Sequence, residues 1–206
     1  MDEIVQGTEA WHAARLGKVT ASRVADMMAR TKTGPSASRK NYRAELVLER
    51  LTGQRLDGYT NAAMQWGTET EPQARAAYEF LTDRTVAEIG FVVHPTIADL
   101  GASPDGLVGD DGLLEIKCPN PATHLELIET GAIPDKYIKQ MQTQMACTGR
   151  NWCDFVSFDP RFPAEHQVWM MRVERDDELI AEIETAAAEF LAEVEAAVAA
   201  LSRKAA

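Results

Sequence analysis

The stretch Gly101-Ala102-Ser103-Pro104-Asp105-Gly106-Leu107-Val108-Gly109-Asp110-Asp111-Gly112-Leu113-Leu114-Glu115-Ile116-Lys117-Cys118 decides the fold of this chain. Its first half is typical of a turn entering a strand at residues 106–108, and its second half predicts the next strand at 113–118 after an Asp-Gly turn. Alternate residues of a strand face the same side, so Glu115 and Lys117 point together while Leu114 and Ile116 point into the core. An acid and a base between buried neighbours are costly unless something compensates them.

A divalent cation held by Asp105 and Glu115 would provide that compensation, with Lys117 beside a metal-bound water. The alternative is an ordinary charged hairpin on the surface. An acid followed about ten residues later by Glu-x-Lys also arises by chance in charged proteins. The spacing alone leaves both interpretations open.

Length and composition favour one globular domain spanning residues 1–206. The chain has 206 residues, is 45% hydrophobic, and contains neither an internal repeat nor a Pro/Gly/Ser-rich linker. No apolar run approaches the roughly 20 residues that cross a bilayer, and the start, Met1-Asp2-Glu3-Ile4, is acidic where a signal peptide would be basic. We therefore expect a cytoplasmic protein without a membrane partner. The cysteines, which are Cys118, Cys147 and Cys153, have no spacing for a disulfide framework, a zinc site or an iron–sulfur site.

The charge is unevenly distributed along the chain. Its net value of −11 argues against a nucleic-acid partner. Residues 15–43, however, carry eight basic side chains against the single acid Asp26, and residues 176–206 carry eight acids against two bases. This segregation is compatible with a basic inner surface for phosphates and an acidic outer one that repels them. A solvated charged face is the alternative explanation for either half.

Helical patterns dominate the first 82 residues. Thr8 can cap a helix through Arg15, and Thr20 or Ser22 a second one through about Arg30. Residues 32–38 read as a basic flexible loop. Ser38 then caps a helix with apolar positions at 46, 48 and 51 that ends at Gly53. Residues 62–81 are helical, with Pro72 near a start or a kink and a buried side at 78, 80 and 81.

Strands and helices alternate in the remainder. Apolar runs predict strands at 86–94, 106–108, 113–118, 152–158 and 168–174, and helices at 121–131 and 134–148. The last helix has a single apolar stripe at spacings of three and four, formed by Leu179, Ile183, Ala187, Phe190, Val194, Val198 and Leu201.

This order of elements, with carboxylates on the central strands, resembles the lambda exonuclease family, the YqaJ-type viral recombinases of the PD-(D/E)xK nuclease superfamily. The resemblance runs in order along nearly the whole chain. Its matching pieces are Gln6-Gly7, Trp11-His12, Arg15-Leu16-Gly17, Thr20-Ala21-Ser22, Trp66-Gly67 with Glu71, Ser103 to Leu107, Leu114 to Pro119, Tyr137, Gln140, Gln142, Asp159-Pro160-Arg161 and Glu174-Arg175-Asp176. It implies an α/β (α+β) fold with a restriction-endonuclease-like core, in which helices flank a mixed central β-sheet.

The resemblance also implies roles for the acids. Asp105 and Glu115 would hold the catalytic magnesium with the carbonyl of Ile116, and Glu71 on its helix would complete a two-metal site. Glu69 is the alternative to Glu71. Hard oxygen donors suit Mg²⁺, with Mn²⁺ as a possible substitute. Lys117 would lower the pKa of the attacking water or hold a phosphate oxygen.

A second group of residues resembles the family's site for a terminal 5′-phosphate. Arg15 would bind the phosphate through its two-pronged guanidinium, and Ser22, Ser103 and Gln140 would donate hydrogen bonds to it. Each of the three hydrogen-bond donors has a competing interpretation. Ser22 could cap a helix, Ser103 could belong to a turn, and Gln140 could occupy an exposed helix position. Lys32 and Met64 are possible further DNA contacts. The alternative interpretations are a solvated surface lysine for Lys32 and a core methionine for Met64.

The implied function is that of a Mg²⁺-dependent 5′ to 3′ exonuclease. It would degrade one strand of linear double-stranded DNA from a 5′-phosphorylated end and leave 3′ single strands for annealing recombination. The resemblance also implies a homotrimeric ring and a single-strand annealing protein as partner. It implies a phage or prophage origin in a bacterial host as well. The alternatives are another PD-(D/E)xK nuclease, either an endonuclease or a Cas4-like enzyme, and a non-catalytic module that binds DNA ends.

Overall fold

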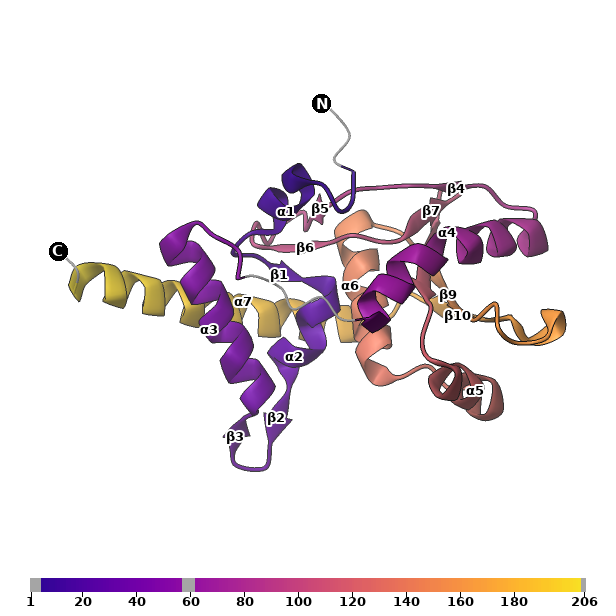
Figure 1. The fold of residues 1–206 in the computed structure, drawn as a ribbon. Coiled ribbons are helices and arrows are strands. Elements are labelled where there is room, and N and C mark those ends of the chain that lie inside the picture. The colour runs from indigo at the N-terminus through magenta and orange to yellow at the C-terminus, as the bar shows by residue number, and fades with distance from the viewer. Residues whose placement is uncertain (1–4, 57–61, 205–206) are drawn as a thin grey trace.

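A five-stranded mixed sheet lies in the right-hand half of the molecule as seen in Figure 1. The computed structural model describes residues 5–56 and 62–204. The sheet order is β10-β9-β8-β7-β4, in which β8 (Gly112–Lys117) and β9 (Trp152–Phe158) run parallel. The antiparallel members are β10 (Val168–Glu174), β7 (Gly106–Val108) and β4 (Val86–Ala87). The mixed sheet predicted from the sequence is therefore confirmed.

Helices cover both faces of this sheet. The helix α4 (Ala62–Thr82) packs on one face, where Leu114 and Ile116 meet Tyr78. The helices α5 (Pro121–Thr130) and α6 (Asp135–Thr148) cover the other face, where Leu113 meets Met141 in a second core. Because β8 is buried on both sides, its polar residues have to find partners inside the protein.

A second layer packs beside the sheet and contains the long helix α7 (Asp177–Lys204). It includes a small sheet of β1 (Val19–Thr20), β6 (Leu100–Ala102) and β5 (Val92–Val93), the helices α1 (Glu9–Arg15), α2 (Val24–Met28) and α3 (Ala37–Thr52), and the 3₁₀ turn Ala21–Arg23. A 3₁₀ turn at Ala164–His166 contacts β10 of the larger sheet instead. Tyr42 of α3 stacks on Phe190 of α7, with ring centroids 5.6 Å apart, and both rings are buried. The apolar stripe of α7 predicted from the sequence forms this core, apart from the half-exposed Leu201.

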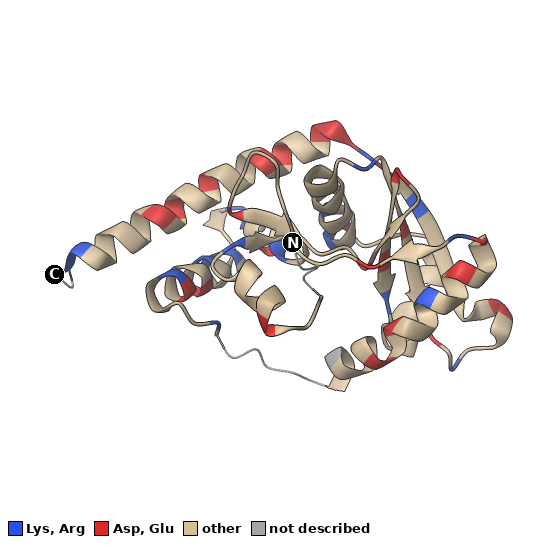
Figure 2. Ribbon diagram, turned by 90° about the horizontal axis from the view of Figure 1, so that it is seen from above, with Lys and Arg blue, Asp and Glu red and all other residues tan. Residues whose placement is uncertain are grey.

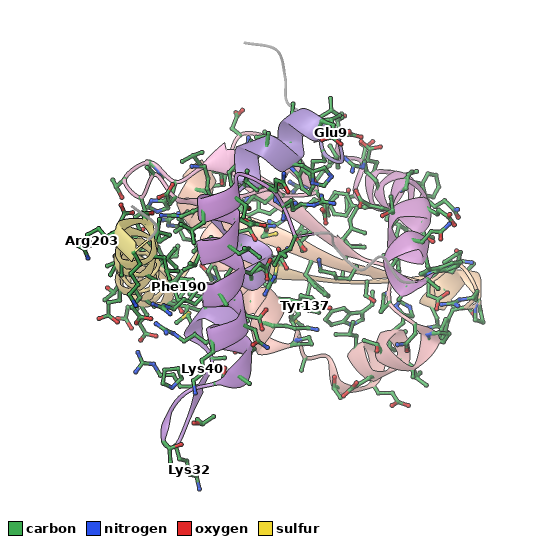
Figure 3. The ribbon with its side chains drawn as sticks, turned by 60° about the vertical axis from the view of Figure 1, so that its left-hand side comes forward. Glu9, Lys32, Lys40, Tyr137, Phe190 and Arg203 are labelled. Carbon is green, nitrogen blue, oxygen red and sulfur yellow. The ribbon has the colours of Figure 1, made fainter. Side chains whose placement is uncertain are left out.

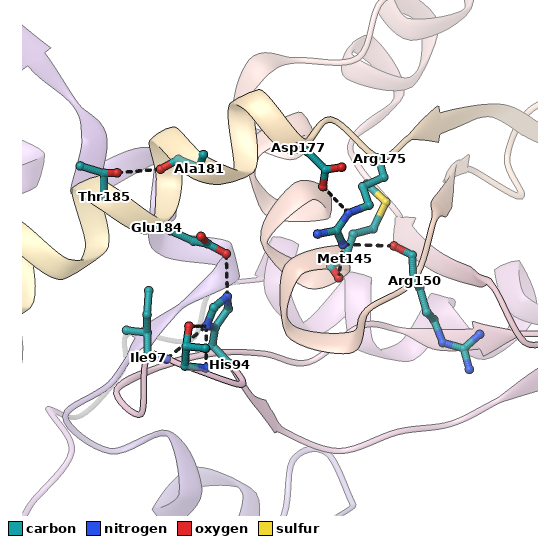
Figure 4. A network of polar contacts seen from close by, with 10 residues as sticks. His94, Ile97, Met145, Arg150, Arg175, Asp177, Ala181, Glu184 and Thr185 are labelled. Carbon is teal, nitrogen blue, oxygen red and sulfur yellow. Dashed lines mark hydrogen bonds and ion pairs between the residues drawn. The ribbon is translucent and has the colours of Figure 1, made fainter.

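Polar contacts fix the beginning of α7 (Figure 4). The Nδ1 atom of His94 accepts from the backbone N–H of Ile97 at 3.2 Å, so its proton is on Nε2 and is donated to Glu184 at 3.0 Å. Arg175 donates to the carbonyl of Met145 at 2.9 Å and pairs with Asp177. These contacts join α7 to α6 and to the loop after β5.

Part of the basic segment pairs with the acidic helix. The Arg39 guanidinium donates to both oxygens of Glu193 at 2.9 Å, and Arg43 donates to the carbonyl of the same residue at 3.0 Å. Acidic residues lie along α7 from Asp177 to Glu195 (Figure 2). The prediction of two separate charged surfaces is therefore wrong for this contact, because opposite charges from the two segments meet across α3 and α7.

Four predicted boundaries are wrong. Residues 86–94 form the two short strands β4 and β5, which belong to different sheets. Residues 32–38 include part of a hairpin of β2 (Arg30–Thr31) and β3 (Gly34–Pro35) rather than a plain loop. The N-cap of α3 is Ser36, whose hydroxyl accepts from the N–H of Arg39 at 3.1 Å, and not Ser38. A 3₁₀ turn precedes the short α2, so Ser22 caps no α-helix there.

Some predicted core positions lie on the surface. Tyr78 is fully buried, whereas Phe80 is 87% exposed and Leu81 is 54% exposed. Each helical residue turns by about 100°, so Phe80 lies on the side of α4 opposite to Tyr78. Leu48 and Leu51 of α3 are likewise exposed, while Leu46 is buried. Within the described residues, no helix combines the length and apolarity that a membrane span requires.

Candidate active site

The turn before β7 brings Asp105 beside Glu115. Gly106 pairs with Leu114, and the Asp105 N–H donates to the Leu114 carbonyl at 3.1 Å. Extending this antiparallel register by one residue sets Asp105 opposite Glu115, on the same face of the sheet. Gly106 is required here, because a Cβ atom would lie 2.1 Å from Cγ1 of Val86. Oδ2 of Asp105 accepts from the Ile116 N–H at 2.6 Å, which fixes the carboxylate.

Glu115 is fully buried, and its two carboxylate oxygens have separate partners. Oε1 accepts from Nε2 of Gln140 at 2.6 Å and forms an ion pair with Lys117. Oε2 accepts from Nε2 of Gln144, also at 2.6 Å. The sequence analysis did not identify Gln144. The available signal was its spacing of four residues from Gln140, which places two amides on one face of a helix.

Burial and neighbouring charges shift the pKa values of Asp105 and Lys117. Desolvation by burial, followed by the charge of Glu115, raises the pKa of Asp105 well above its usual 3.8. Burial lowers the pKa of Lys117, but the Glu115 and Asp105 carboxylates outweigh this effect and raise it above 10.5. Burial and the neighbouring carboxylates thus disfavour the charged form of Asp105, although Lys117 is close.

The helix acid Glu71 lies on α4 and belongs to the same groove as Asp105. Its charge contributes to the raised pKa of Asp105. Its Oε1 atom pairs with Nη2 of Arg75 at 2.8 Å. The alternative acid, Glu69, also lines the groove and accepts from Nε2 of Gln65 at 2.8 Å. The geometry thus brings Asp105 and Glu115 together and holds Glu71 in an ion pair at their side.

The donor chemistry of these residues fits a hard divalent cation. Carboxylate and carbonyl oxygens are the ligands that Mg²⁺ prefers, and the negative charges of Glu115 and Glu71 both act on Asp105. Within residues 5–56 and 62–204, no three His, Cys, Asp or Glu side chains lie close enough to form a metal site by themselves.

A cavity of about 180 Å³ lies beside the acids. Its lining contains all four residues predicted for the terminal phosphate, which are Arg15, Ser22, Ser103 and Gln140. The other lining residues are Gln6, Trp11, Thr20 and Ala21. The Arg15 guanidinium stacks 3.8 Å above the Trp11 ring, and Nε1 of Trp11 donates to Oγ of Ser103 at 2.9 Å. Burial lowers the pKa of Arg15 from its usual 12.5, yet leaves the group charged at neutral pH. We call this cavity the arginine pocket.

The arginine pocket and the acids share one groove. This groove has a volume of about 1410 Å³ and is lined by Arg15 and Ser22 at one part and by Glu71 and Asp105 at another. Gln140 connects the two sites, because it lines the arginine pocket and also donates to Glu115.

One of the two possible DNA contacts, Lys32, lies outside this arrangement. Lys32 is exposed on the β2–β3 hairpin, which projects away from the body of the molecule (Figure 3). Neither the pocket nor the groove includes Lys32 among its described lining residues. Met64 lies within α4, but its side chain is outside the described part of the structure.

The fold and sequence define the class of this protein. The chain belongs to the YqaJ-like viral recombinase domain family, whose model matches residues 10–151. This finding confirms the family resemblance identified from the sequence motifs.

Among solved structures, the chain is similar to an alkaline exonuclease, LHK-Exo, from Laribacter hongkongensis. The two are 63% identical over 96% of this chain and 98% of the other, with a TM-score of 0.90. LHK-Exo in complex with dAMP matches with the same identity and coverage and a TM-score of 0.91. A phage related exonuclease from Haemophilus somnus 129PT is 18% identical over 87% of this chain and 95% of the other, and its TM-score of 0.67 shows a shared fold. No curated protein sequence matches the chain.

Proposed function

We propose that this protein is a metal-dependent 5′ to 3′ exonuclease that degrades one strand of linear double-stranded DNA from a 5′-phosphorylated end. One observation carries the proposal: the arginine pocket opens into the groove that contains Asp105, and Gln140 belongs to both sites. The likeness to an alkaline exonuclease, also studied with dAMP, supports DNA as the substrate. The products would be mononucleotides and a 3′ single strand.

Chain residues provide the metal ligands and the proton chemistry. Asp105, Glu115, the carbonyl of Ile116 and Glu71 would hold Mg²⁺, with two ions expected and Mn²⁺ as a substitute; the metal would supply Lewis-acid activation of water and charge stabilisation. Lys117 holds a positive charge beside Glu115, where it can donate to a phosphate oxygen or favour deprotonation of the attacking water.

The arginine pocket would orient the DNA end. A guanidinium stacked on Trp11 presents a fixed plane of donors, which suits two-pronged binding of a phosphate. The hydroxyls of Ser22 and Ser103 lie on the same lining and can donate further hydrogen bonds. A terminal phosphate held there would align the adjoining nucleotide with the acids of the shared groove.

The assembly and cellular context belong to the same proposal. The family membership supports a role in recombination, in which a single-strand annealing protein would receive the 3′ strand. A homotrimeric ring around DNA, a site of action in the bacterial cytoplasm and a phage or prophage origin complete the proposal.

The proposal is tested with linear duplex, nicked circles and closed circles, each incubated with Mg²⁺ or with a chelator. We expect degradation of linear DNA only, and complete dependence on the metal. Cutting of closed circles would identify an endonuclease instead. Binding of linear DNA without hydrolysis would identify a non-catalytic module.

A further inference from the structure

Two glutamines of α6, one helical turn apart, are directed at the same carboxylate. Gln140 donates to Oε1 of Glu115 and Gln144 donates to Oε2, both at 2.6 Å. Gln140 is 8% exposed and Gln144 is fully buried. The described ion pair of Lys117 is with Oε1, and Gln144 provides a hydrogen bond to the other oxygen, Oε2.

The orientation of the Gln144 amide is determined by its partner. Its NH₂ group has to face the carboxylate, because two oxygens placed at 2.6 Å would repel each other. Its own Oε1 atom is consequently buried without a hydrogen-bond donor from the described residues. An apolar side chain would avoid this cost in a core. The contact with Glu115 is therefore the feature that accounts for glutamine at this position.

We infer that Gln144 is a positioning residue that holds the orientation of the Glu115 carboxylate, and thereby controls metal binding and turnover without contacting the DNA end. Gln140 has a second role because it also lines the arginine pocket. Loss of Gln144 should weaken the acid site alone, whereas loss of Gln140 should also reduce selection of the phosphorylated end. This inference rests on the proposed function.

The same helix offers a matched control. Gln142 is 1% exposed, and its amide donates to the Glu174 carbonyl at 2.8 Å and accepts from the Asp176 N–H at 2.9 Å. It makes no described contact with Glu115. Gln142→Leu therefore removes a buried amide of equal size without disturbing the acid site.

The test measures Mn²⁺ affinity by titration calorimetry on the free protein, and kcat, KM and the preference for 5′-phosphate on linear duplex. For Gln144→Leu we expect a loss of about 10- to 100-fold in Mn²⁺ affinity or kcat. The KM for DNA and the phosphate preference should stay at the parent values. Gln142→Leu should change none of these quantities. Gln144→Met, which keeps the length of the side chain, replaces the leucine variant if the latter does not fold.

Parent-like Mn²⁺ affinity and kcat in a folded Gln144 variant would overturn the inference, as would equal losses in the Gln142 control. A parent protein that binds Mn²⁺ but does not hydrolyse DNA would contradict the proposed function instead. In that case the calorimetric comparison alone decides the role of Gln144. A parent protein that binds no Mn²⁺ overturns both.

Discussion

The acid site concentrates opposite charges where water is largely excluded. Glu115 is fully buried, and Asp105 lies across the hairpin from it. Lys117 compensates one of the two carboxylates, while the amides of Gln140 and Gln144 bind Glu115 without adding charge. A site of this kind favours a bound cation and disfavours loss of the positive charge on Lys117.

Replacement of the ammonium tests its catalytic role. Lys117→Ala should reduce hydrolysis by at least about 100-fold while retaining DNA binding, because the positive charge at the reacting phosphate is lost. Single-turnover hydrolysis and a gel-shift assay measure the two properties. Lys136→Ala is the control. The ammonium groups of Lys117 and Lys136 both lie over the Tyr137 ring, at 5.2 and 4.7 Å from its centroid, but Lys136 is exposed. A near-parent rate for Lys117→Ala would rule out the proposed role.

A second prediction concerns Arg15 in the arginine pocket and the choice of DNA end. Arg15→Ala should remove most of the preference for phosphorylated ends, a change of about 10- to 100-fold for a charge-assisted pair of hydrogen bonds. The rate on 5′-hydroxyl ends should remain near that of the parent. Competition between the two duplexes gives the ratio directly. Arg30→Ala, which removes an exposed charge of the hairpin, serves as the control. An unchanged ratio in Arg15→Ala would contradict this role.

Sequence reasoning identified the acids but not all of their partners. The alternation of β8 predicted that Glu115 and Lys117 share a face, and the structure confirms it. Gln140 was assigned only to the phosphate, although it also donates to Glu115. Gln144 was missed, because the approach of α6 to the sheet depends on tertiary packing that no local pattern encodes.

At the scale of elements, α3 and α7 are joined by charge as well as by apolar packing. Arg39 is 7% exposed and donates to both oxygens of the half-exposed Glu193, while Phe190 stacks on Tyr42 beside this pair. The contact explains why the basic and acidic segments, far apart in sequence, do not form independent surfaces.

This ion pair should make stability depend on pH. The hydrogen bonds from Arg39 lower the pKa of Glu193 below its usual 4.5; burial opposes this effect, while Arg43 and Arg30 add to it. A lowered folded-state pKa stabilises the protein fully above the unfolded value, and this contribution is lost as the pH falls through the folded value. Glu193→Gln should therefore cost about 1 kcal/mol at pH 7.

The cost of Glu193→Gln should shrink as the pH falls below 4.5 and disappear at lower pH. Urea denaturation of parent and variant across this range measures it. Glu182→Gln, on the exposed side of the same helix, should show no comparable trend. A difference that is constant with pH would show that the pair does not stabilise the fold.

Long periodic elements were predicted better than short ones. The helices 121–130 and 135–148 and the strands 152–158 and 168–174 match the prediction closely. Residues 86–94 were predicted as one strand, because a continuous apolar pattern does not reveal that the chain passes from one sheet to another. Phe80 was assigned to the core although its helical angle to Tyr78 places it in solvent.

At the scale of the whole molecule, a groove connects the arginine pocket with the acid site. An open groove on one chain does not by itself retain DNA through repeated cleavage. A ring of three chains would retain it, and we predict a trimer of about three times the 22.7 kDa chain mass. Light scattering after size-exclusion chromatography measures this mass, and a monomer at micromolar concentration would exclude the ring.

The most direct test compares two linear duplexes that differ only in carrying a 5′-phosphate or a 5′-hydroxyl, with Mg²⁺ and a label on each strand. The proposed function predicts faster release of mononucleotides from the 5′-phosphorylated strand, with the complementary 3′ strand left intact. Equal rates on both duplexes, or release starting from the 3′ end, would contradict it.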